Sequence, residues 1–351
     1  MPAGCFKTRY IDDMALLGTA WKRFWLVVFA LLVLTVPLVA SNYLLSLLNL
    51  SLIYIIAVLG LNLLTGNAGQ ISLGNAAFLA IGAFTAGSLA SMLKFPFWLT
   101  VPLGGIAAML VGIMVGIPAL RIKGFYLLLA TLALHFITES LSLSYQIRYF
   151  GPVGIRFPVP ALGPLVFDSP QKYYYLLLVI CAGAVLFTAN VMRTQEGRAF
   201  MAVRDRDIAA MLIGVDVART KIVAFALSSL YVGVAGALLG YYFGNVSAEN
   251  FPLMLAVDHL AMIIIGGMGS IFGSISGTIF VVLFPHIIPE FIALVMSFSS
   301  ALGALMKPHE FEIRTILMGL LILFVLIYKP EGLHGAYEDL KHYFSKWPFR
   351  Y

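Results

Sequence analysis

Hydrophobic residues form long runs along this chain, and polar residues rarely interrupt them. Residues 24–93 contain no Asp, Glu, Lys or Arg. A helix needs about 20 predominantly apolar residues to cross the hydrocarbon of a bilayer, so runs of this length predict membrane-spanning helices. We therefore expect an all-α polytopic membrane protein of about ten transmembrane helices. The predicted spans lie near residues 24–42, 45–64, 70–93, 97–120, 124–145, 173–192, 220–243, 254–284, 287–305 and 313–329.

Two glycine-rich segments, residues 66–75 and 266–277, make two of these spans irregular. Backbone groups freed from a helix are tolerated at membrane depth only where protein buries them or a wet cavity borders them. One interpretation is close packing of helices through small residues. The other is a pair of broken or re-entrant helices beside a translocation pathway, one in each half of the chain. On this second interpretation the candidate pathway residues are Gly69, Gln70, Ser72, Gly74, Asn75, Gly267, Ser270 and Ser274.

The composition agrees with a membrane protein and sets its expected orientation. Hydrophobic residues make up 61% of the chain and charged residues only 11%, whereas a soluble domain carries about 25% charge. The net charge of +6 comes from basic residues scattered between apolar runs, so we expect no nucleic-acid partner. With ten spans, 16 of the 22 Lys and Arg residues lie on one side, which places both termini in the cytoplasm. The expected parts are a cytoplasmic N-terminus (1–23), a transmembrane domain (24–329) with an external loop (146–172) and a cytoplasmic loop (193–221), and a cytoplasmic tail (330–351).

No motif for catalysis or for a cofactor was found in the sequence. A Gly-Lys dipeptide is absent, so the chain lacks the loop that cradles nucleotide phosphates, and any ATP must be bound by a partner. The six histidines form no His-Glu-x-x-His pattern, and Cys5 and Cys181 are far apart. We therefore expect no enzyme, no catalytic residue, no metal and no cofactor.

Ionisable residues inside a span are functional candidates, because they are costly in the bilayer. Three pairs qualify: His135 with Glu139, Asp258 with His259, and His286 with Glu290. His135 and Glu139 stand four residues apart on one helical face, as a proton relay requires. Glu139 lies near the external end of its predicted span and Asp258 one turn inside its own, however. These positions favour interfacial or structural roles.

The segment 193–221 is too charged to span a membrane and too apolar for a solvated linker. Ala199, Ala202 and Val203 share one side of a short predicted helix. Asp207 is placed to cap a second short helix, which Gly214 ends. Two short helices with apolar faces need something to cover them. Either another protein or the lipid headgroups can do so.

At this segment the chain resembles the permease subunits of bacterial branched-chain amino-acid ABC importers, specifically the longer, LivM-type subunit. Four motifs in the same order carry the resemblance, which extends from about residue 45 to 335. Where family members frequently carry His, this chain has Asn75. The motifs are Gly69-Gln70-Ile71-Ser72-Leu73-Gly74 with Ala77-Phe78 and Gly82-Ala83-Phe84; Gly197-Arg198-Ala199 with Arg204, Ala209-Ala210 and Gly214; Gly266-Gly267-Met268-Gly269-Ser270 with Gly273; and Lys329-Pro330-Glu331-Gly332-Leu333.

The resemblance implies a transport subunit in a bacterial inner membrane that moves branched-chain amino acids inward. It implies that residues 197–214, including Gly197, Arg198, Ala199, Arg204, Ala209, Ala210 and Gly214, couple the subunit to an ATPase. It further implies as partners a second, similar permease subunit, two ATP-binding subunits, and an extracytoplasmic substrate-binding protein, besides the membrane lipid.

Other functions compete with this interpretation. A permease for urea or short amides is the nearest alternative, because related urea permeases share these motifs. A secondary carrier would need a buried coupling-ion site, and acidic residues are sparse near the middle of the spans. A membrane-embedded enzyme would need a nucleophile with a base or a metal cluster, which the sequence lacks.

Overall fold

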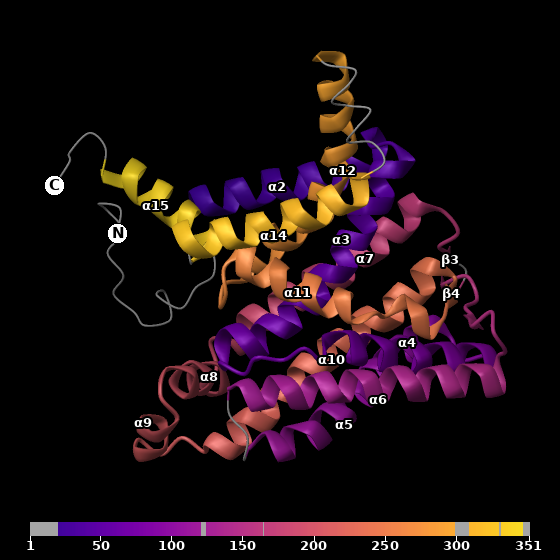
Figure 1. Ribbon diagram of the computed structural model, residues 1–351, viewed down its shortest axis with the longest axis horizontal. Coiled ribbons are helices and arrows are strands. Elements are labelled where there is room, and N and C mark those ends of the chain that lie inside the picture. The colour runs from indigo at the N-terminus through magenta and orange to yellow at the C-terminus, as the bar shows by residue number, and fades with distance from the viewer. Residues whose placement is uncertain (1–19, 121–123, 164, 299–308, 330, 347–351) are drawn as a thin grey trace.

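Figure 1 shows the computed structural model, which describes residues 20–120, 124–163, 165–298, 309–329 and 331–346. Helices dominate this part of the chain, so the predicted all-α architecture is confirmed. The helices are α2 (Ala20–Val39), α3 (Asn42–Leu61), the π-helix η1 (Asn62–Asn67), α4 (Asn75–Met92), α5 (Phe97–Ala119), α6 (Phe125–Tyr149), α7 (Pro170–Val191), α8 (Gln195–Asp205), α9 (Asp207–Leu212), α10 (Val217–Phe243), the 3₁₀ turn η2 (Ala248–Asn250), α11 (Leu253–Gly266), α12 (Ile271–Phe298), α14 (Glu310–Tyr328) and α15 (Gly332–Lys346).

Among the described residues, eight helices are long and apolar enough to cross a membrane. A ninth span results if the bent pair Thr315–Tyr328 and Gly332–Lys341 crosses as one unit. Most helices begin or end within a few residues of the predicted spans. The protein is therefore a multi-pass membrane protein, as predicted.

The largest difference from the predicted spans lies between residues 253 and 298. The span 254–284 is broken within its glycine-rich segment, as the interpretation of broken helices predicts, because α11 ends at Gly266 and α12 begins at Ile271. The predicted boundary between 284 and 287 is wrong, since α12 continues through it to Phe298. Pro285 lies inside this helix, and neighbouring helices and local adjustments let membrane helices accommodate proline. Residues 299–308 of the predicted span 287–305 lie outside the described residues.

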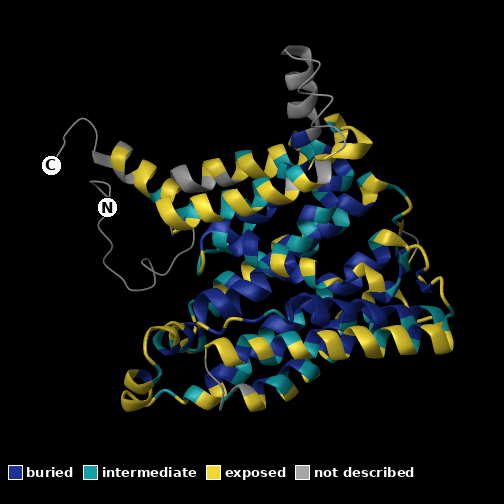
Figure 2. Ribbon diagram, in the orientation of Figure 1, coloured by how far each residue is buried: buried dark blue, intermediate teal, exposed yellow. Residues whose placement is uncertain are grey.

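Helix α10 lies at the centre of the fold and packs most extensively against α5, α4 and α3. Small residues permit this contact: a Cβ at Gly82 would lie 2.0 Å from the carbonyl oxygen of Gly233, and one at Gly236 2.0 Å from that of Leu79. Without a hydrophobic driving force between helices in lipid, such close backbone approach is a main source of packing energy. Figure 2 shows the consequence, a buried centre beneath the exposed surfaces of α2, α14 and α15.

The connections lie at the two ends of the molecule. Helices α8 and α9 lie at one end in Figure 1, where α15 is also found. At the opposite end, β1 (Ile155–Arg156) pairs antiparallel with β4 (Asn245–Val246), and β2 (Ala161–Leu162) forms a hairpin with β3 (Leu165–Val166). The segments 193–221 and 146–172 thus lie at opposite ends of the helices, the separation that the charge pattern predicts.

Candidate coupling and pathway site

The first glycine-rich segment is a break between two membrane helices. Helix α3 continues as η1 through Asn67, and the chain is then irregular until α4 begins at Asn75. π-helices are rare and often mark functional sites. Gly66 lies inside η1, and a Cβ there would lie 1.9 Å from the side-chain oxygen of Asn62 and 2.5 Å from the backbone nitrogen of Gly269. Glycine at position 66 therefore allows two distant segments of the chain to touch.

The second glycine-rich segment combines both interpretations of its sequence. Gly266 packs against α12, since its Cβ would lie 1.9 Å from the Gly273 carbonyl oxygen and 3.1 Å from Gly277 Cα. These three glycines serve close helix packing. The next four residues form the turn between α11 and α12, in which Gly267 has a φ of +115°. The segment is therefore also a helix break.

Asn62 connects the two breaks. Its side-chain nitrogen donates to the Ser270 carbonyl at 3.0 Å, and its side-chain oxygen accepts from the Gly269 backbone nitrogen at 2.8 Å. The side chain is 2% exposed, so both bonds lie in a poorly screened environment. Asn62 is not among the residues that the sequence pattern indicates. The only sequence signal is an amide in an otherwise apolar run just before the first glycine motif.

Arg204 joins α8 to the same junction. Its guanidinium donates to the Gly66 carbonyl at 2.7 Å, and one of its nitrogens would lie 2.9 Å from a Cβ on Gly269. Its backbone contacts the first motif as well, because a Cβ on Gly69 would lie 3.2 Å from Arg204 Cα. The predicted coupling segment therefore contacts both glycine-rich breaks through one residue.

The fourth motif, after α14, reaches the junction from the other side. A Cβ on Gly332 would lie 2.6 Å from the Gly267 backbone nitrogen, and a Cβ on Gly267 would lie 2.5 Å from the Glu331 carbonyl oxygen. Lys329 donates to the Asp339 carboxylate in α15, and this hydrogen bond raises the pKa of Lys329 above its ordinary value. Four motifs that are far apart in the sequence thus meet at one end of the membrane helices.

The polar side chains predicted along a pathway mostly bond within their own turns. Ser72 accepts from the Gly74 backbone nitrogen at 3.2 Å, Ser270 accepts from that of Gly273 at 3.1 Å, and Ser274 donates to the Ser270 carbonyl at 3.1 Å. Gln70 is 8% exposed, and its side chain approaches the Ala68 carbonyl at 3.4 Å. These bonds shape the two turns.

Asn75 has a different setting, at the start of α4. Its amide nitrogen lies 2.7 Å from Nδ1 of His259 in α11, and both side chains are buried. The His259 ring also meets Tyr54 edge to face at 4.9 Å. A candidate pathway residue thus contacts one of the predicted ionisable residues.

Of the other predicted pairs, His286 bonds to the Tyr43 hydroxyl at 2.7 Å, and the Glu290 side chain lies outside the described part of the chain.

The apolar side of α8 is covered by the protein itself. Phe200 and Val203 are buried, and Phe200 packs in a cluster with Phe225 of α10 and Leu64. The predicted side of Ala199, Ala202 and Val203 was therefore only partly correct, because the aromatic residue provides the anchor. Gly197 permits this docking, since a Cβ there would lie 2.5 Å from Met192 Cα.

The start of α9 differs from the prediction. Arg206, not Asp207, is the N-cap residue, and no side chain caps the helix. Asp207 instead accepts a hydrogen bond from Lys221 of α10 at 2.9 Å, and the Lys221 side chain is 3% exposed. The buried ammonium needs an anionic partner, which explains why the carboxylate turns away from the helix end.

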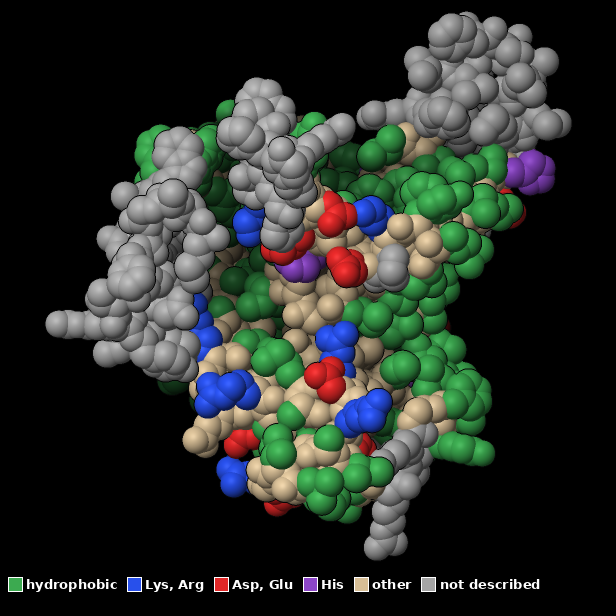
Figure 3. All heavy atoms as spheres, turned by 90° about the vertical axis from the view of Figure 1, so that its left-hand side faces the viewer, with side chains coloured by type: hydrophobic (Ala, Val, Ile, Leu, Met, Phe, Trp, Pro, Cys, Tyr) green, Lys and Arg blue, Asp and Glu red, His purple; other side chains and the backbone are tan. Residues whose placement is uncertain are grey.

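The remaining side of α9 is uncovered. Ile208, Leu212 and Ile213 are 74%, 83% and 77% exposed. Charged side chains gather on the same end of the molecule (Figure 3).

The other predicted coupling residues lie around this surface. Arg198 is exposed and donates to the Arg193 carbonyl, Ala199 is half-buried, Ala209 is exposed, Ala210 is buried, and Gly214 turns with a φ of +89°.

Comparison with known proteins decides the family. The sequence profile of the family described as "Branched-chain amino acid transport system / permease component" matches residues 43–326. The chain belongs to this permease family. It is 30% identical over 340 residues to the Escherichia coli high-affinity branched-chain amino acid transport system permease protein LivM. The aligned region covers 90% of this chain and 76% of that protein.

Two further relatives define how far the similarity extends. This permease is 25% identical over 322 residues to a probable LivM of Methanocaldococcus jannaschii, covering 80% of this chain and 90% of that protein. It is 33% identical to the Escherichia coli xylose transport permease XylH, but over only 116 residues, 31% of this chain and 28% of that protein. No solved structure matches the chain. The permease is therefore of the LivM type, and its family is a transporter component.

Proposed function

We propose that this chain is a permease subunit of an ABC importer that carries branched-chain amino acids inward across the bacterial inner membrane. Separate ATPase subunits supply the energy, a second permease subunit completes the membrane part, and an extracytoplasmic binding protein delivers the substrate. Both termini then lie in the cytoplasm with α8 and α9. The relatives named for branched-chain amino acid transport support the substrate class.

The uncovered surface of α9 is the observation that carries the proposal. We define the α9 patch as Ile208, Met211, Leu212 and Ile213, which are all more than 60% exposed. Exposed apolar patches rimmed by charge typically mark protein interaction sites. The charged neighbours Arg204, Asp205 and Arg206 provide such a rim. A cytoplasmic ATPase subunit is the partner that fits an importer.

The contacts between Arg204, Gly66 and Asn62 can transmit a movement of the α9 patch to the membrane helices. The α9 patch follows directly on α8, whose Arg204 holds Gly66 in η1. Through Asn62, η1 is bonded to the turn before α12. A displacement of α8 and α9 by an ATPase therefore reaches α3, α4 and α12 through few contacts.

A substitution in the α9 patch tests the docking. Leu212→Glu should weaken association with the ATPase subunits at least tenfold, because it places a charge in an apolar contact. The side chain is 83% exposed, so the substitution should leave the packing of the chain unchanged. Val153→Glu, on an exposed apolar residue at the opposite end, is the matched control. Co-purification of the ATPase with both variants measures the effect. Equal retention of the ATPase by both would contradict this docking surface.

Uptake by the complete complex tests the substrate. Proteoliposomes that contain the complete complex should take up labelled leucine when the binding protein is on the external side of the permease and ATP is on the ATPase side. Uptake of urea without uptake of leucine would remove the amino-acid assignment and leave the importer architecture in place.

A further inference from the structure

Helix α6 carries a polar stripe along one face. His135, Thr138, Glu139, Ser142 and Tyr145 recur every three or four residues and so lie on one face. In the structure α6 extends to Tyr149, which places Glu139 fourteen residues after Phe125 and ten before Tyr149. This carboxylate is therefore close to the middle of the span, not near its end as the sequence predicted.

The Glu139 carboxylate lies among exposed apolar side chains, where contact with lipid would be energetically unfavourable. Its side chain is 46% exposed, and its neighbours Phe136 and Leu143 are exposed apolar residues. Nε2 of His135 lies 3.8 Å away, yet within the described part of the chain neither ring nitrogen of this buried histidine has a hydrogen-bond partner. Ionisable groups in spans almost always face a polar or water-filled space and mark the path of a substrate or ion.

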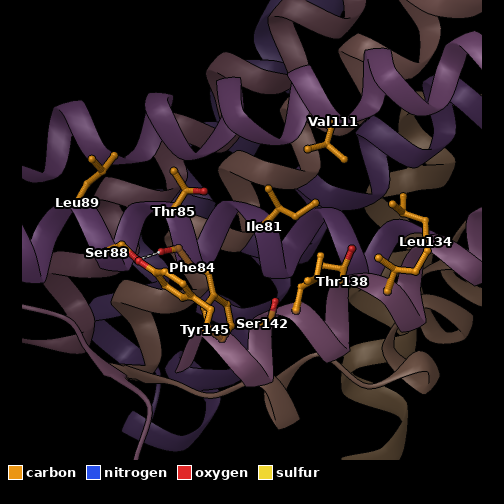
Figure 4. A pocket seen from close by; sticks show the side chains of 12 residues that line it. Ile81, Phe84, Thr85, Ser88, Leu89, Val111, Leu134, Thr138, Ser142 and Tyr145 are labelled. Carbon is orange, nitrogen blue, oxygen red and sulfur yellow. Dashed lines mark hydrogen bonds between the residues drawn. The ribbon is translucent and has the colours of Figure 1, made fainter. Parts of the chain in front are cut away.

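A largely apolar groove adjoins the stripe. The groove is open at the surface, has a volume of about 650 Å³ and lies between α4, α5 and α6. Figure 4 shows Ile81 and Leu134 on its apolar side, with Thr138, Ser142 and Tyr145 of the stripe facing it. Thr138 and Ser142 belong to both the stripe and the groove, and Glu139 lies next to Thr138 on the same helix. Polar stripe and apolar groove are therefore continuous.

The stripe connects the two ends of the molecule. Toward α8 and α9 it continues to Thr131, which accepts a hydrogen bond from the Leu73 backbone nitrogen in the first glycine-rich segment at 3.0 Å. Toward the other end it reaches Gln146, which accepts from the Ala248 backbone nitrogen at 2.8 Å and donates to the Pro152 carbonyl at 3.2 Å. A polar track thus runs the depth of the membrane helices.

We propose that the α6 stripe and the adjoining groove form one wall of the substrate pathway, in which Glu139 contacts the ammonium group of an amino acid in transit. The aliphatic side chain of the substrate then moves along the groove formed by Ile81, Phe84, Leu134, Ile137 and Leu141. This inference rests on the proposed function and adds the route and the contact that selects an ammonium group.

The charge of Glu139 is tested in the complete reconstituted complex. Glu139→Gln keeps the size of the side chain and should lower the initial rate of leucine uptake at least tenfold, whereas Glu139→Asp should retain more activity than Glu139→Gln. Association of the ATPase and its basal hydrolysis should remain as in the unmodified complex. Glu249→Gln, at an exposed acidic residue in η2, is the matched control. Normal uptake by Glu139→Gln, or an equal loss in Glu249→Gln, would overturn the proposal.

The exposure of the groove to water is tested separately. With Cys5 and Cys181 replaced by serine, Ser142→Cys should react with a charged thiosulfonate, and leucine-loaded binding protein with ATP should change the rate. Ser144→Cys lies two residues away on a different face and should not react. Labelling of Ser142→Cys by a lipid-soluble maleimide alone, in every nucleotide state, would assign the groove to lipid and overturn the pathway. Failure of the proposed function itself would appear differently, as an unmodified complex that takes up no leucine.

Discussion

Single residues decide how closely the segments at the junction approach. Gly66 fills a position where the nearest atoms leave no room for a methyl group. Sequence analysis identified the glycine-rich segments and Arg204, because glycine density and a charged loop are visible in any sequence. It could not identify Asn62, since one buried amide in an apolar run resembles any other until its distant partners are known.

The first prediction concerns Gly66. Gly66→Ala should destabilise the detergent-solubilised permease by about 1–3 kcal/mol, the usual range for overpacking, and should separate η1 from Gly269. Gly183→Ala is the control, because Gly183 is a helical glycine with nothing within 4 Å of a Cβ. Thermal unfolding measures both variants. If Gly66→Ala unfolds at the same temperature as Gly183→Ala, the contact between η1 and Gly269 tolerates a methyl group and the prediction is wrong.

The second prediction concerns Arg204. Arg204→Glu replaces the donor to the Gly66 carbonyl with an acceptor, so ATP hydrolysis should lose its dependence on the substrate-loaded binding protein. The affinity of the binding protein for its substrate should not change. Arg156→Glu, in β1 at the opposite end, serves as the control. Normal uptake together with normal stimulation of hydrolysis in Arg204→Glu would exclude this residue from coupling.

At the scale of elements, hydropathy placed most of the helices, and glycine density indicated the two breaks at 66–75 and 266–277. The apolar runs predicted the helix positions within a few residues over most of the chain. The division of α11 from α12 depends on the contact of Gly266 with Gly273, which periodicity does not reveal. The partner of Asp207 was likewise hidden, because the N-cap position looks favourable in the sequence while Lys221 is fourteen residues away.

The third prediction uses the ion pair that ties α9 to α10. Asp207→Asn leaves the 3% exposed Lys221 side chain without its anion, and removal of one partner from a buried pair costs about 3–5 kcal/mol. Lys221→Met should cost less, because the Asp207 side chain is 21% exposed and retains contact with water. Limited proteolysis of the segment 193–221, together with thermal unfolding, measures the order of the two variants. Equal sensitivity of the two would show that burial of Lys221 does not govern the pair.

At the scale of the whole molecule, the sequence predicted a multi-pass membrane protein, and the structure adds the central position of α10. The charge bias alone predicted which loops share a side. The convergence of four motifs on one end required the fold, because the motifs begin at residues 69, 197, 266 and 329 and no local pattern relates them.

The fourth prediction concerns orientation. In a background with both native cysteines replaced, Pro160→Cys should react with an impermeant thiol reagent added outside cells, and Asp205→Cys should react only after the membrane is opened. The two positions lie at opposite ends of the described molecule (Figure 1). Labelling of both from the same side would contradict the proposed topology.

The α9 patch has a consequence for the life of the subunit in the cell. On the proposed topology and partners, a permease made without its ATPase would present the α9 patch to the cytoplasm, with three of its four residues on a helix of only six residues, and short helices open readily. Housekeeping proteases recognise such features, so orphan copies should be degraded faster than assembled ones. The proposed docking surface would then also adjust the number of permease molecules to the supply of their partners.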